Sequence, residues 1–412
     1  MTAKLEAYEG IVGAAVIRQL QHLGQKLEGT GVVHVNSTRQ GGGVAEILGW
    51  MIPLMCGLGL NARWEVLNGA GEFFSITKAI HNGLQGFPVN ISSTGWQIYQ
   101  DANAVNFERL RPLLEDADVV VIHDPQPAPL LNLCSNRKGK WIWRGHIDIS
   151  HPFHPTWKAL KKFVVGYDAS IFSMCQFALP LPHPQFLIAP SIDPLSDKNC
   201  DLGEGELEEA RGRFGLDPYR PLVVQISRFD RFKDPVGVIE AYRLVRRVSP
   251  IQLVLAGGGA VDDPEGKAML DEVLEAAAGD PDIHVLLLPP DDHRTINALQ
   301  RLADIVIQKS TREGFGLTVT EGLWKGKPVI GGDVGGIRSQ VVNYHTGFLV
   351  NTPEGAAHRI RFLLHHGELR NNMGVKAREY VRENFLLTRH LQEYLTLFHQ
   401  LLSKRGEKMF YV

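Results

Sequence analysis

Residues 304–332 read DIVIQKSTREGFGLTVTEGLWKGKPVIGG, and this stretch indicates the fold class. Two short apolar runs, DIVIQ and PVIGG, flank a glycine-containing loop and a segment that we predict to be a helix beginning near Leu317. Nearly continuous apolar runs separated by helices are typical of parallel strands that are buried on both faces. The stretch therefore predicts a strand–helix–strand unit of an α/β protein.

The same alternation continues through most of the chain. Further strand candidates are GVVHV, ARWEVL, DVVVIH and KWIWRG in the first half and LVVQIS, IQLVLA and IHVLLL in the second. The pattern breaks over about 181–221, where proline and polar residues indicate a linker, with the boundary near Pro190. We predict two doubly wound, Rossmann-like domains, 1–190 and 191–385, that face a central cleft, and a helix in 386–412 that can pack back on the first domain.

Composition excludes several classes of protein. An apolar content of 44% and a charged content of 21% are those of a soluble globular chain, and a net charge of -2 indicates no general attraction to nucleic acid or anionic membrane. The first ten residues lack an apolar signal core, and Ile47–Leu60 is too short to span a bilayer, so we predict a buried helix there and a cytoplasmic location. The four scattered cysteines predict buried or inert thiols.

The glutamates of the opening stretch are its chemical signal. From Glu313 in the loop to Glu321 on the helix is about two helical turns. The first N–H groups of the helix have no partner inside it, and the positive helix end suits a diphosphate or sugar hydroxyls. One carboxylate can then hold a sugar while the other holds a ribose. An ordinary capped helix with surface glutamates is the structural alternative.

Two cations follow the strand LVVQI in the segment SRFDRFKDP. Arg228 and Lys233 lie just past the strand end, where loops and helix N-termini of such sheets bind ligands. A guanidinium and an ammonium together can neutralise a diphosphate leaving group. The alternative is that both are solvated surface charges.

Three further loops follow strands in the first half. Gly42 and Gly43, in NSTRQGGGVAEIL, form a tight turn into a helix and a possible cradle for phosphate or sugar. His146 ends a strand in WRGHIDIS, and HDPQP ends another. No spacing indicates a metal site, no motif indicates nicotinamide or ATP binding, and no nucleophile motif is present.

Taken together, these motifs resemble a known family. The pair Glu313 and Glu321, with Arg228 and Lys233 upstream, resembles the family-four retaining glycosyltransferases of GT-B fold. More narrowly, HVNSTRQGGGVAEIL, GEFFSITKAIHNGLQG, WRGHIDIS and QKSTREGFGLTVTEGLWKGKPVIGG are similar to segments of the trehalose glycosyltransferring synthase family. This likeness extends over nearly the whole chain, and it implies that 1–190 is the acceptor side and 191–385 binds the nucleotide sugar.

The resemblance implies roles around the donor sugar and its ribose. Glu313 would hold hydroxyls of the donor glucose, helped by the amides of Phe315 and Gly316. His146 would contact the donor sugar near its anomeric centre, and Glu321 would hold the ribose hydroxyls.

A second group of residues is implied for the diphosphate. The amides of Leu317 and Thr318 would contact it, and Gly43 would approach the donor phosphates from the other domain. Arg228 and Lys233 would bind the diphosphate as it leaves, so that catalysis would rest on His146, these two cations and Glu313.

The implied reaction joins NDP-glucose and glucose to give α,α-trehalose and NDP, reversibly and with retention at the donor carbon. We expect free glucose as acceptor, because Asp124, Gln126 and Asp148 suit hydroxyls, although Arg39 and Lys78 are cations that could pair with a phosphate. Trehalose phosphorylase, a sucrose-type synthase, a nucleotide-sugar epimerase and a non-catalytic sugar-binding protein stay open as alternatives. No bound cofactor and no divalent metal are indicated. The donor base (UDP, ADP or GDP) is left open, and a homo-oligomer is compatible with the sequence.

Overall fold

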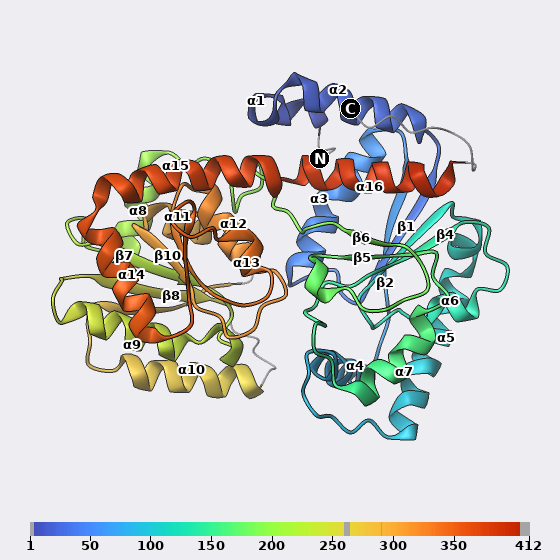
Figure 1. Ribbon diagram of the computed structural model, residues 1–412, viewed down its shortest axis with the longest axis horizontal. Helices are drawn as coiled ribbons and strands as arrows, with labels where there is room; N and C mark the ends of the chain where they lie inside the picture. Colours follow the sequence, from blue (N-terminus) through green and yellow to red (C-terminus); the bar gives the residue numbers. More distant parts are fainter. Residues whose placement is uncertain (1–3, 259–263, 290, 404–412) are drawn as a thin grey trace. The chain divides into compact units, whose positions relative to one another are not determined.

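Two parallel sheets organise the chain. The computed structural model describes residues 4–258, 264–289 and 291–403. The chain divides into two compact units: unit 1, Met1–Pro190 with Leu387–Val412, and unit 2, Ser191–Leu386. Each unit contains one six-stranded sheet with helices packed on it (Figure 1). The α/β class predicted from the alternation of apolar runs and helices is therefore confirmed.

Unit 1 has the strand order β2-β1-β3-β4-β5-β6, and all neighbouring strands are parallel. The chain first moves outward from β1 to β2 and then returns to the other side of β1, so the direction of winding reverses between β1 and β3. The strands are β1 (Gly31–Asn36), β2 (Asn61–Val66), β3 (Val119–His123), β4 (Lys140–Arg144), β5 (Ala169–Phe172) and β6 (Gln185–Leu187).

Helices of very different length connect these strands. The predicted buried helix over Ile47–Leu60 is confirmed as the greater part of α3, where Leu48, Met51 and Met55 are buried. The unit 1 helices are η1 (Leu5–Tyr8), α1 (Glu9–Val12), α2 (Ala14–Lys26), α3 (Gly43–Gly57), α4 (Gly71–Leu84), α5 (Ser93–Asp116), α6 (Leu130–Leu133), α7 (His154–Val164), η2 (Cys175–Phe177) and α16 (Leu387–Leu402).

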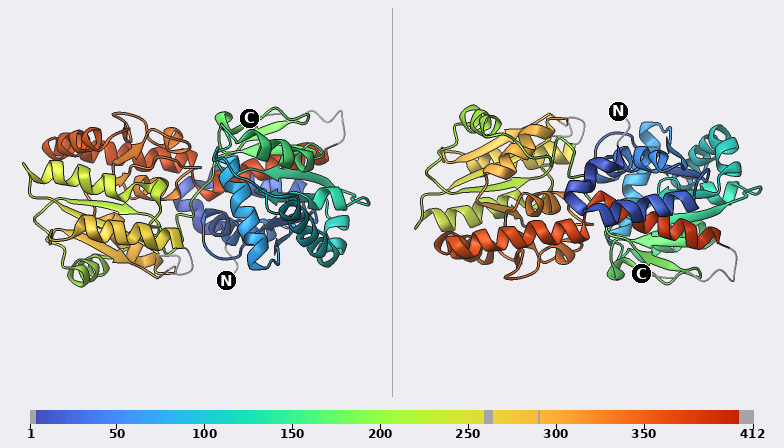
Figure 2. Two further views of the ribbon diagram at one scale, coloured as in Figure 1. Left: turned by 90° about the horizontal axis from the view of Figure 1, so that it is seen from below. Right: turned by 90° about the horizontal axis from the view of Figure 1, so that it is seen from above.

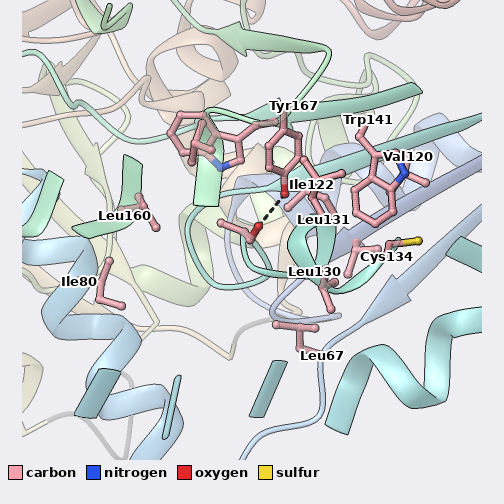
Figure 3. Packing of buried hydrophobic residues seen from close by; sticks show 14 of the residues in the cluster. Leu67, Ile80, Val120, Ile122, Leu130, Leu131, Cys134, Trp141, Leu160 and Tyr167 are labelled. Carbon is pink, nitrogen blue, oxygen red and sulfur yellow. Dashed lines mark hydrogen bonds between the residues drawn. The ribbon is translucent and has the colours of Figure 1, made fainter. Parts of the chain in front are cut away.

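Alternate residues of the unit 1 strands pack into two separate apolar clusters. Val33 belongs to one cluster and Val32 to the other, because successive side chains of a strand point to opposite faces. Figure 3 shows part of the first cluster, in which Trp141 packs near Tyr167 and the Tyr167 hydroxyl donates to the carbonyl of Ala128 at 2.9 Å. The sheet is thus buried on both faces, as its apolar runs require.

The last described helix returns to the first unit. Leu391, Tyr394 and Phe398 of α16 belong to the second apolar cluster, together with Leu20 of α2. Figure 1 and the second view of Figure 2 show α16 lying along α2, although the two are far apart in sequence. This helix therefore closes the face of the unit 1 sheet that carries Val32.

Unit 2 has the strand order β12-β11-β10-β7-β8-β9, again with all neighbours parallel. The winding reverses between β7 and β10, which lie side by side with Val223 opposite Ile305. The strands are β7 (Leu222–Ile226), β8 (Gln252–Gly257), β9 (Ile283–Leu287), β10 (Ile305–Gln308), β11 (Val329–Gly332) and β12 (Gly347–Val350).

Helices cover both faces of the unit 2 sheet (Figure 2). Helix α9 packs against α10 and α14, whereas α11 packs against α8 and α12. The unit 2 helices are α8 (Glu204–Phe214), η3 (Arg231–Lys233), α9 (Pro235–Arg246), α10 (Pro264–Ala277), α11 (His293–Leu302), α12 (Leu317–Trp324), α13 (Ile337–Gln340), α14 (Pro353–His365) and α15 (Gly367–Asn384).

Some local features differ from the sequence prediction. The strands β5, β6 and β12 were not predicted, because they are short and lie near turns or in the proline-rich linker. All four cysteines are free thiols; Cys134 is buried, whereas Cys56 and Cys175 are exposed, so burial holds for only some of the thiols that were predicted to be buried or inert. In the part of the chain that the structure describes, every helix is too short or too polar to cross a bilayer.

Candidate functional site

An ion pair lies where the winding of unit 2 reverses. The loops after β7 and β10 meet at the carboxyl edge of the sheet, the place where ligands of doubly wound sheets bind. There, Nζ of Lys233 pairs with Oε2 of Glu313, and their side chains are only 18% and 10% exposed. The hydroxyl of Ser310 lies 3.4 Å from the same carboxylate oxygen. The fold thus brings together two residues that are 80 positions apart.

The backbone around Glu313 is held by close packing. A Cβ atom on Gly335, whose φ is +42°, would lie 1.7 Å from the carbonyl oxygen of Glu313, so only glycine fits. The amide of Gly336 donates to that carbonyl at 3.3 Å, and the amide of Thr311 donates to the carbonyl of Phe232 at 2.8 Å. The loop of Glu313 is therefore fixed against its neighbours on two sides.

A second ion pair lies beside the first. Nζ of Lys309, whose side chain is 6% exposed, pairs with Oδ2 of Asp234, which caps α9 by accepting from the amide of Gly237 at 3.2 Å. Gln225 donates to the carbonyl of Lys233 at 2.8 Å. These contacts order the loop on which Lys233 stands.

Arg228 stays apart from these pairs. Its side chain is 73% exposed, and its guanidinium lies 3.8 Å from the carboxylate of Asp230. The structure therefore leaves the Arg228 guanidinium on the surface of the loop after β7 and does not bring it into contact with Glu313.

The predicted start of α12 at Leu317 is confirmed, and the residues before it form its N-cap. Gly316 has a φ of +85°, a conformation that favours glycine, and its carbonyl accepts from the amide of Val319 at 3.0 Å. Phe315 is buried against Phe385, whereas Leu317 and Thr318 are half-buried in the first turn. The amides of this first turn lie at the positive end of the helix and can receive an anion.

Glu321 is buried inside unit 2 and not on its surface. Its Oε1 lies 3.7 Å from Nζ of Lys198, while its Oε2 has no hydrogen-bond partner among the described residues. Lys325, one turn later, is also buried, and burial lowers the pKa of its ammonium while Glu321 opposes the shift. Nζ of Lys325 donates to Oδ1 of Asn199 at 3.0 Å. The free oxygen of Glu321 is therefore suited to accept a hydroxyl.

Three histidines line up at the corresponding edge of unit 1. Nδ1 of His34 lies 2.9 Å from Nε2 of His123, and Nδ1 of His123 lies 2.8 Å from Nε2 of His146. His34 and His123 are buried, and His146 is half-buried. Burial lowers the pKa of His34 to about 3 and lowers the pKa of His123 and of His146 well below the usual value. All three rings are therefore neutral near pH 7.

The candidate acceptor residues lie in the loops after β3 and β4. Oδ1 of Asp124 accepts from the amide of His146 at 2.8 Å, and burial raises the pKa of Asp124 to about 6. Asp148 accepts from both the amide and the hydroxyl of Ser150. Oε1 of Gln126 is buried without a partner among the described residues. Asp124 and His146 are thus directly linked, whereas Asp148 is occupied within its own turn.

The glycine turn after β1 caps α3. Gly42 is the N-cap residue with a φ of +87°, and α3 begins at Gly43. A Cβ on Gly42 would have no atom within 4 Å, so the outer side of the turn is open. Within residues 4–258, 264–289 and 291–403, no group of three or more histidine, cysteine, aspartate or glutamate side chains could hold a metal ion.

Several supporting residues were missed by the sequence reasoning. His34 interrupts the apolar run GVVHV, and an imidazole in a central strand requires a buried partner, which was the available signal. Lys325 follows Glu321 by four positions, the spacing of a helical ion pair. Lys309 and Gly335 had no distinctive spacing, because they act through residues that are distant in sequence.

Two known families match the chain, one within each of its two units. Residues 34–179 match the family described as trehalose synthase, N-terminal domain. Residues 207–380 match the family described as glycosyl transferases group 1. The first match contains the three aligned histidines, and the second contains Lys233, Glu313 and Glu321.

Individual proteins extend these matches over nearly the full length. The chain is 43% identical over 403 residues to a trehalose synthase of Pyrococcus horikoshii, covering 97% of this chain and 96% of that protein. It is 30% identical to a trehalose phosphorylase of Pleurotus pulmonarius, covering 98% of this chain and 62% of that protein. A solved structure described as trehalose-6-phosphate from E. coli bound with UDP-2-fluoro glucose superposes with a TM-score of 0.74 at 15% identity, covering 90% of this chain and 99% of that one. This last likeness concerns the fold, and it confirms the predicted GT-B class. The chain therefore belongs to the trehalose synthase family and is a glycosyltransferase.

Proposed function

We propose that the enzyme makes α,α-trehalose from a nucleoside-diphosphate glucose and free glucose, releases the nucleoside diphosphate and retains the configuration of the donor carbon. The observation that carries this proposal is the pair of Lys233 and Glu313 beside the N-terminus of α12. A cation, a carboxylate and unpaired helix amides together suit a ligand that has sugar hydroxyls at one end and a diphosphate at the other.

The donor is held by unit 2 in this proposal. Glu313 accepts hydroxyls of the glucosyl group, with the amides of Phe315 and Gly316 beside it. Oε2 of Glu321 accepts from the ribose, which agrees with a buried oxygen that has no partner within the described residues. The amides of Leu317 and Thr318 receive the diphosphate. A nucleotide sugar is also the class of compound named for the E. coli structure.

The chemistry rests on stabilising the leaving group. The bond between the donor anomeric carbon and the diphosphate oxygen breaks, and an acceptor hydroxyl oxygen bonds to that carbon on the same face. The hydroxyl proton passes to the departing diphosphate, so trehalose and NDP leave without a covalent enzyme intermediate. Lys233, and Arg228 on its exposed loop, meet the negative charge as it grows. His146 contacts the donor sugar.

Free glucose is the proposed acceptor. A phosphorylated acceptor needs a cationic fork in unit 1. Arg39 is a poor candidate for it, because its guanidinium donates to the carbonyl of Trp64 at 2.8 Å and lies 4.7 Å from the centre of the Trp64 ring. Asp124 and Asp148 would repel a phosphate dianion and suit hydroxyls instead.

Trehalose phosphorolysis is a second candidate, and the similarity to the Pleurotus protein favours it. In that case inorganic phosphate replaces the nucleoside diphosphate at the same cations. The two activities differ in the compound that must be present: a nucleoside diphosphate for the first, phosphate alone for the second.

One assay separates these proposals. The purified enzyme is incubated with UDP-, ADP- or GDP-glucose and an equal mixture of glucose and glucose 6-phosphate, and the products are resolved by mass and NMR. We expect trehalose with an α,α linkage and release of the nucleoside diphosphate. Predominant trehalose phosphate would contradict the acceptor. Formation of glucose 1-phosphate from trehalose and phosphate, without any nucleotide requirement, would favour phosphorolysis.

A further inference from the structure

The three aligned histidines of unit 1 form a continuous hydrogen-bonded chain. His34 lies within β1, His123 ends β3, and His146 follows β4. The ring centres of His34 and His123 are 5.2 Å apart, as are those of His123 and His146. The chain therefore runs from the interior of the sheet to its carboxyl edge, where His146 is half-buried.

The inner end of this chain is sealed by α16. The ring of His34 lies 5.9 Å from that of Tyr394 and 6.4 Å from that of Phe398. Burial keeps the pKa of all three histidines low, and the nearby Arg144 also lowers the pKa of His123 and His146. The rings are therefore neutral, so each carries one N–H and one lone pair.

Because the three rings are neutral, the two hydrogen bonds between them must be donated in the same direction along the chain. His123 uses both of its nitrogens, so if its Nε2 accepts from His34, its Nδ1 must carry the proton and donate to His146. The reverse direction is equally consistent along the chain. A mixed arrangement would break one of the two hydrogen bonds, and one of the rings would lose its partner.

The inner end of the chain decides between the directions. Nε2 of His34 is buried and has no hydrogen-bond partner among the described residues. If the hydrogen bonds are donated inward, from His146 towards His34, an N–H lies at this atom. If they are donated outward, from His34 towards His146, a lone pair lies there. Buried N–H groups without an acceptor are rarer in proteins than buried acceptors without a donor. The outward direction is therefore favoured.

We propose that His34 and His123 are positioning residues that hold His146 in the tautomer with its proton on Nδ1, so that His146 donates a hydrogen bond to an oxygen of the bound glucosyl donor. The His146 side chain is half-buried, and of its two ring nitrogens only Nε2 forms a hydrogen bond within the described residues. The identity of the ligand rests on the proposed function, but the tautomer does not.

This tautomer has a chemical consequence. With its proton on Nδ1 and its Nε2 lone pair taken by His123, His146 offers a ligand a donor and no basic nitrogen. It can stabilise negative charge on an oxygen, but it cannot accept the proton of the acceptor hydroxyl. The proton must then go elsewhere, which agrees with its transfer to the departing diphosphate.

The tautomer can be measured without any substrate. The protein is labelled with ¹⁵N in its histidines, and two-dimensional ¹H–¹⁵N spectra distinguish protonated from unprotonated ring nitrogens at pH 7. The chain has 16 histidines, so the signals of interest are assigned by their loss in His34→Asn, His123→Asn and His146→Gln. We expect the proton on Nδ1 in all three rings. A proton on Nε2 of His146, or an even mixture of tautomers, would overturn the inference.

Matched variants of His123 test the consequence for turnover. Asparagine can place an N–H near the position of Nδ1, whereas leucine of similar size cannot donate. By analogy with partners that orient metal-binding histidines, His123→Leu should lower kcat by about tenfold or more. The KM for the donor should change little, and His123→Asn should recover most of kcat. Equal kcat losses in both variants, at equal thermal stability, would contradict the positioning role.

The two proposals fail in different ways. If no nucleoside-diphosphate glucose supports trehalose formation but His146 carries its proton on Nδ1, the proposed function is wrong and the tautomer stands. If trehalose is formed while His146 carries its proton on Nε2, the inference about the histidines is wrong and the proposed function stands.

Discussion

Replacing Lys233 by alanine removes the cation of the partly buried pair at the carboxyl edge of unit 2. Glu313 is only 10% exposed and would keep the Ser310 hydroxyl at 3.4 Å as its neighbour. Loss of a hydrogen bond to a charged group costs about 1.5–3 kcal/mol of stability. Loss of a donor that meets transition-state charge costs about 2–4 kcal/mol in activation free energy, which is roughly a 30-fold to 900-fold fall in kcat.

These two effects are separated by a double-mutant cycle with Glu313→Gln. If Lys233 meets the leaving diphosphate, Lys233→Ala should lower kcat even when Glu313 is already glutamine. If Lys233 merely orients Glu313, the second substitution should add nothing. Single-turnover rates at saturating donor give the cycle, and thermal unfolding of each variant corrects for stability.

The matched control is Arg231→Ala in the same short helix. The Arg231 side chain is 73% exposed and its ion-pair partner is Glu272 at 3.5 Å, so its loss should leave kcat nearly unchanged. The reasoning is refuted if Lys233→Ala retains near-normal kcat at saturating donor, or if Arg231→Ala is as damaging as Lys233→Ala.

Three further predictions concern binding, backbone geometry and pH. Glu321→Gln should raise the KM for the donor about tenfold while kcat changes little, since its ligand lies away from the reacting carbon; steady-state kinetics with an equal loss in kcat would contradict this. Gly335→Ala should lower kcat about 100-fold, because its Cβ would overlap the Glu313 carbonyl, whereas Gly215→Ala, with positive φ but open space, should keep kcat. The free energy of unfolding should fall as the pH drops below about 6.5, because the unfolded chain binds protons that the buried, neutral histidines do not bind. In denaturant titrations between pH 5 and 6.5, His34→Asn should flatten this slope by about 1 kcal/mol per pH unit, since the unfolded imidazole is only about half protonated at the upper limit; an unchanged slope would mean that His34 is protonated in the folded state.

Much of the fold could be predicted from the sequence because parallel strands buried on both faces leave a strong pattern. Runs such as DIVIQ and LVVQIS are apolar at nearly every position, and each became a strand. Short strands near turns left no such pattern. The run QFL of β6 has three residues and lies in a proline-rich linker, so its strand conformation depends on pairing with β5.

The candidate site was predictable where its residues follow a strand end or begin a helix. Glu313 and Lys233 were found in this way, because the position of a loop after a strand can be read from the sequence. The side chains that contact such residues could not be predicted from the sequence. Whether Glu321 is exposed or buried depends on Lys198 and Lys325, and the packing that buries them involves the segment 193–201. Single-sequence periodicity contains no signal for that packing.

The sites where the winding of the two sheets reverses differ in charge, and this difference indicates which acceptor is favoured. In unit 2, the edge carries the pairs of Lys233 with Glu313 and of Lys309 with Asp234, so it is rich in formal charge. In unit 1, the equivalent edge carries neutral imidazoles that end at His146, next to Asp124. Burial raises the pKa of Asp124 to about 6 and outweighs the effect of the nearby Arg144, which lowers that pKa, so burial opposes the charge of the carboxylate there. A site that disfavours a carboxylate by desolvation also disfavours a phosphate dianion. A neutral sugar loses less on entering such surroundings, since its hydroxyls can both donate and accept. We therefore expect the charged diphosphate to bind at the edge of unit 2 and the uncharged hexose to bind at the edge of unit 1.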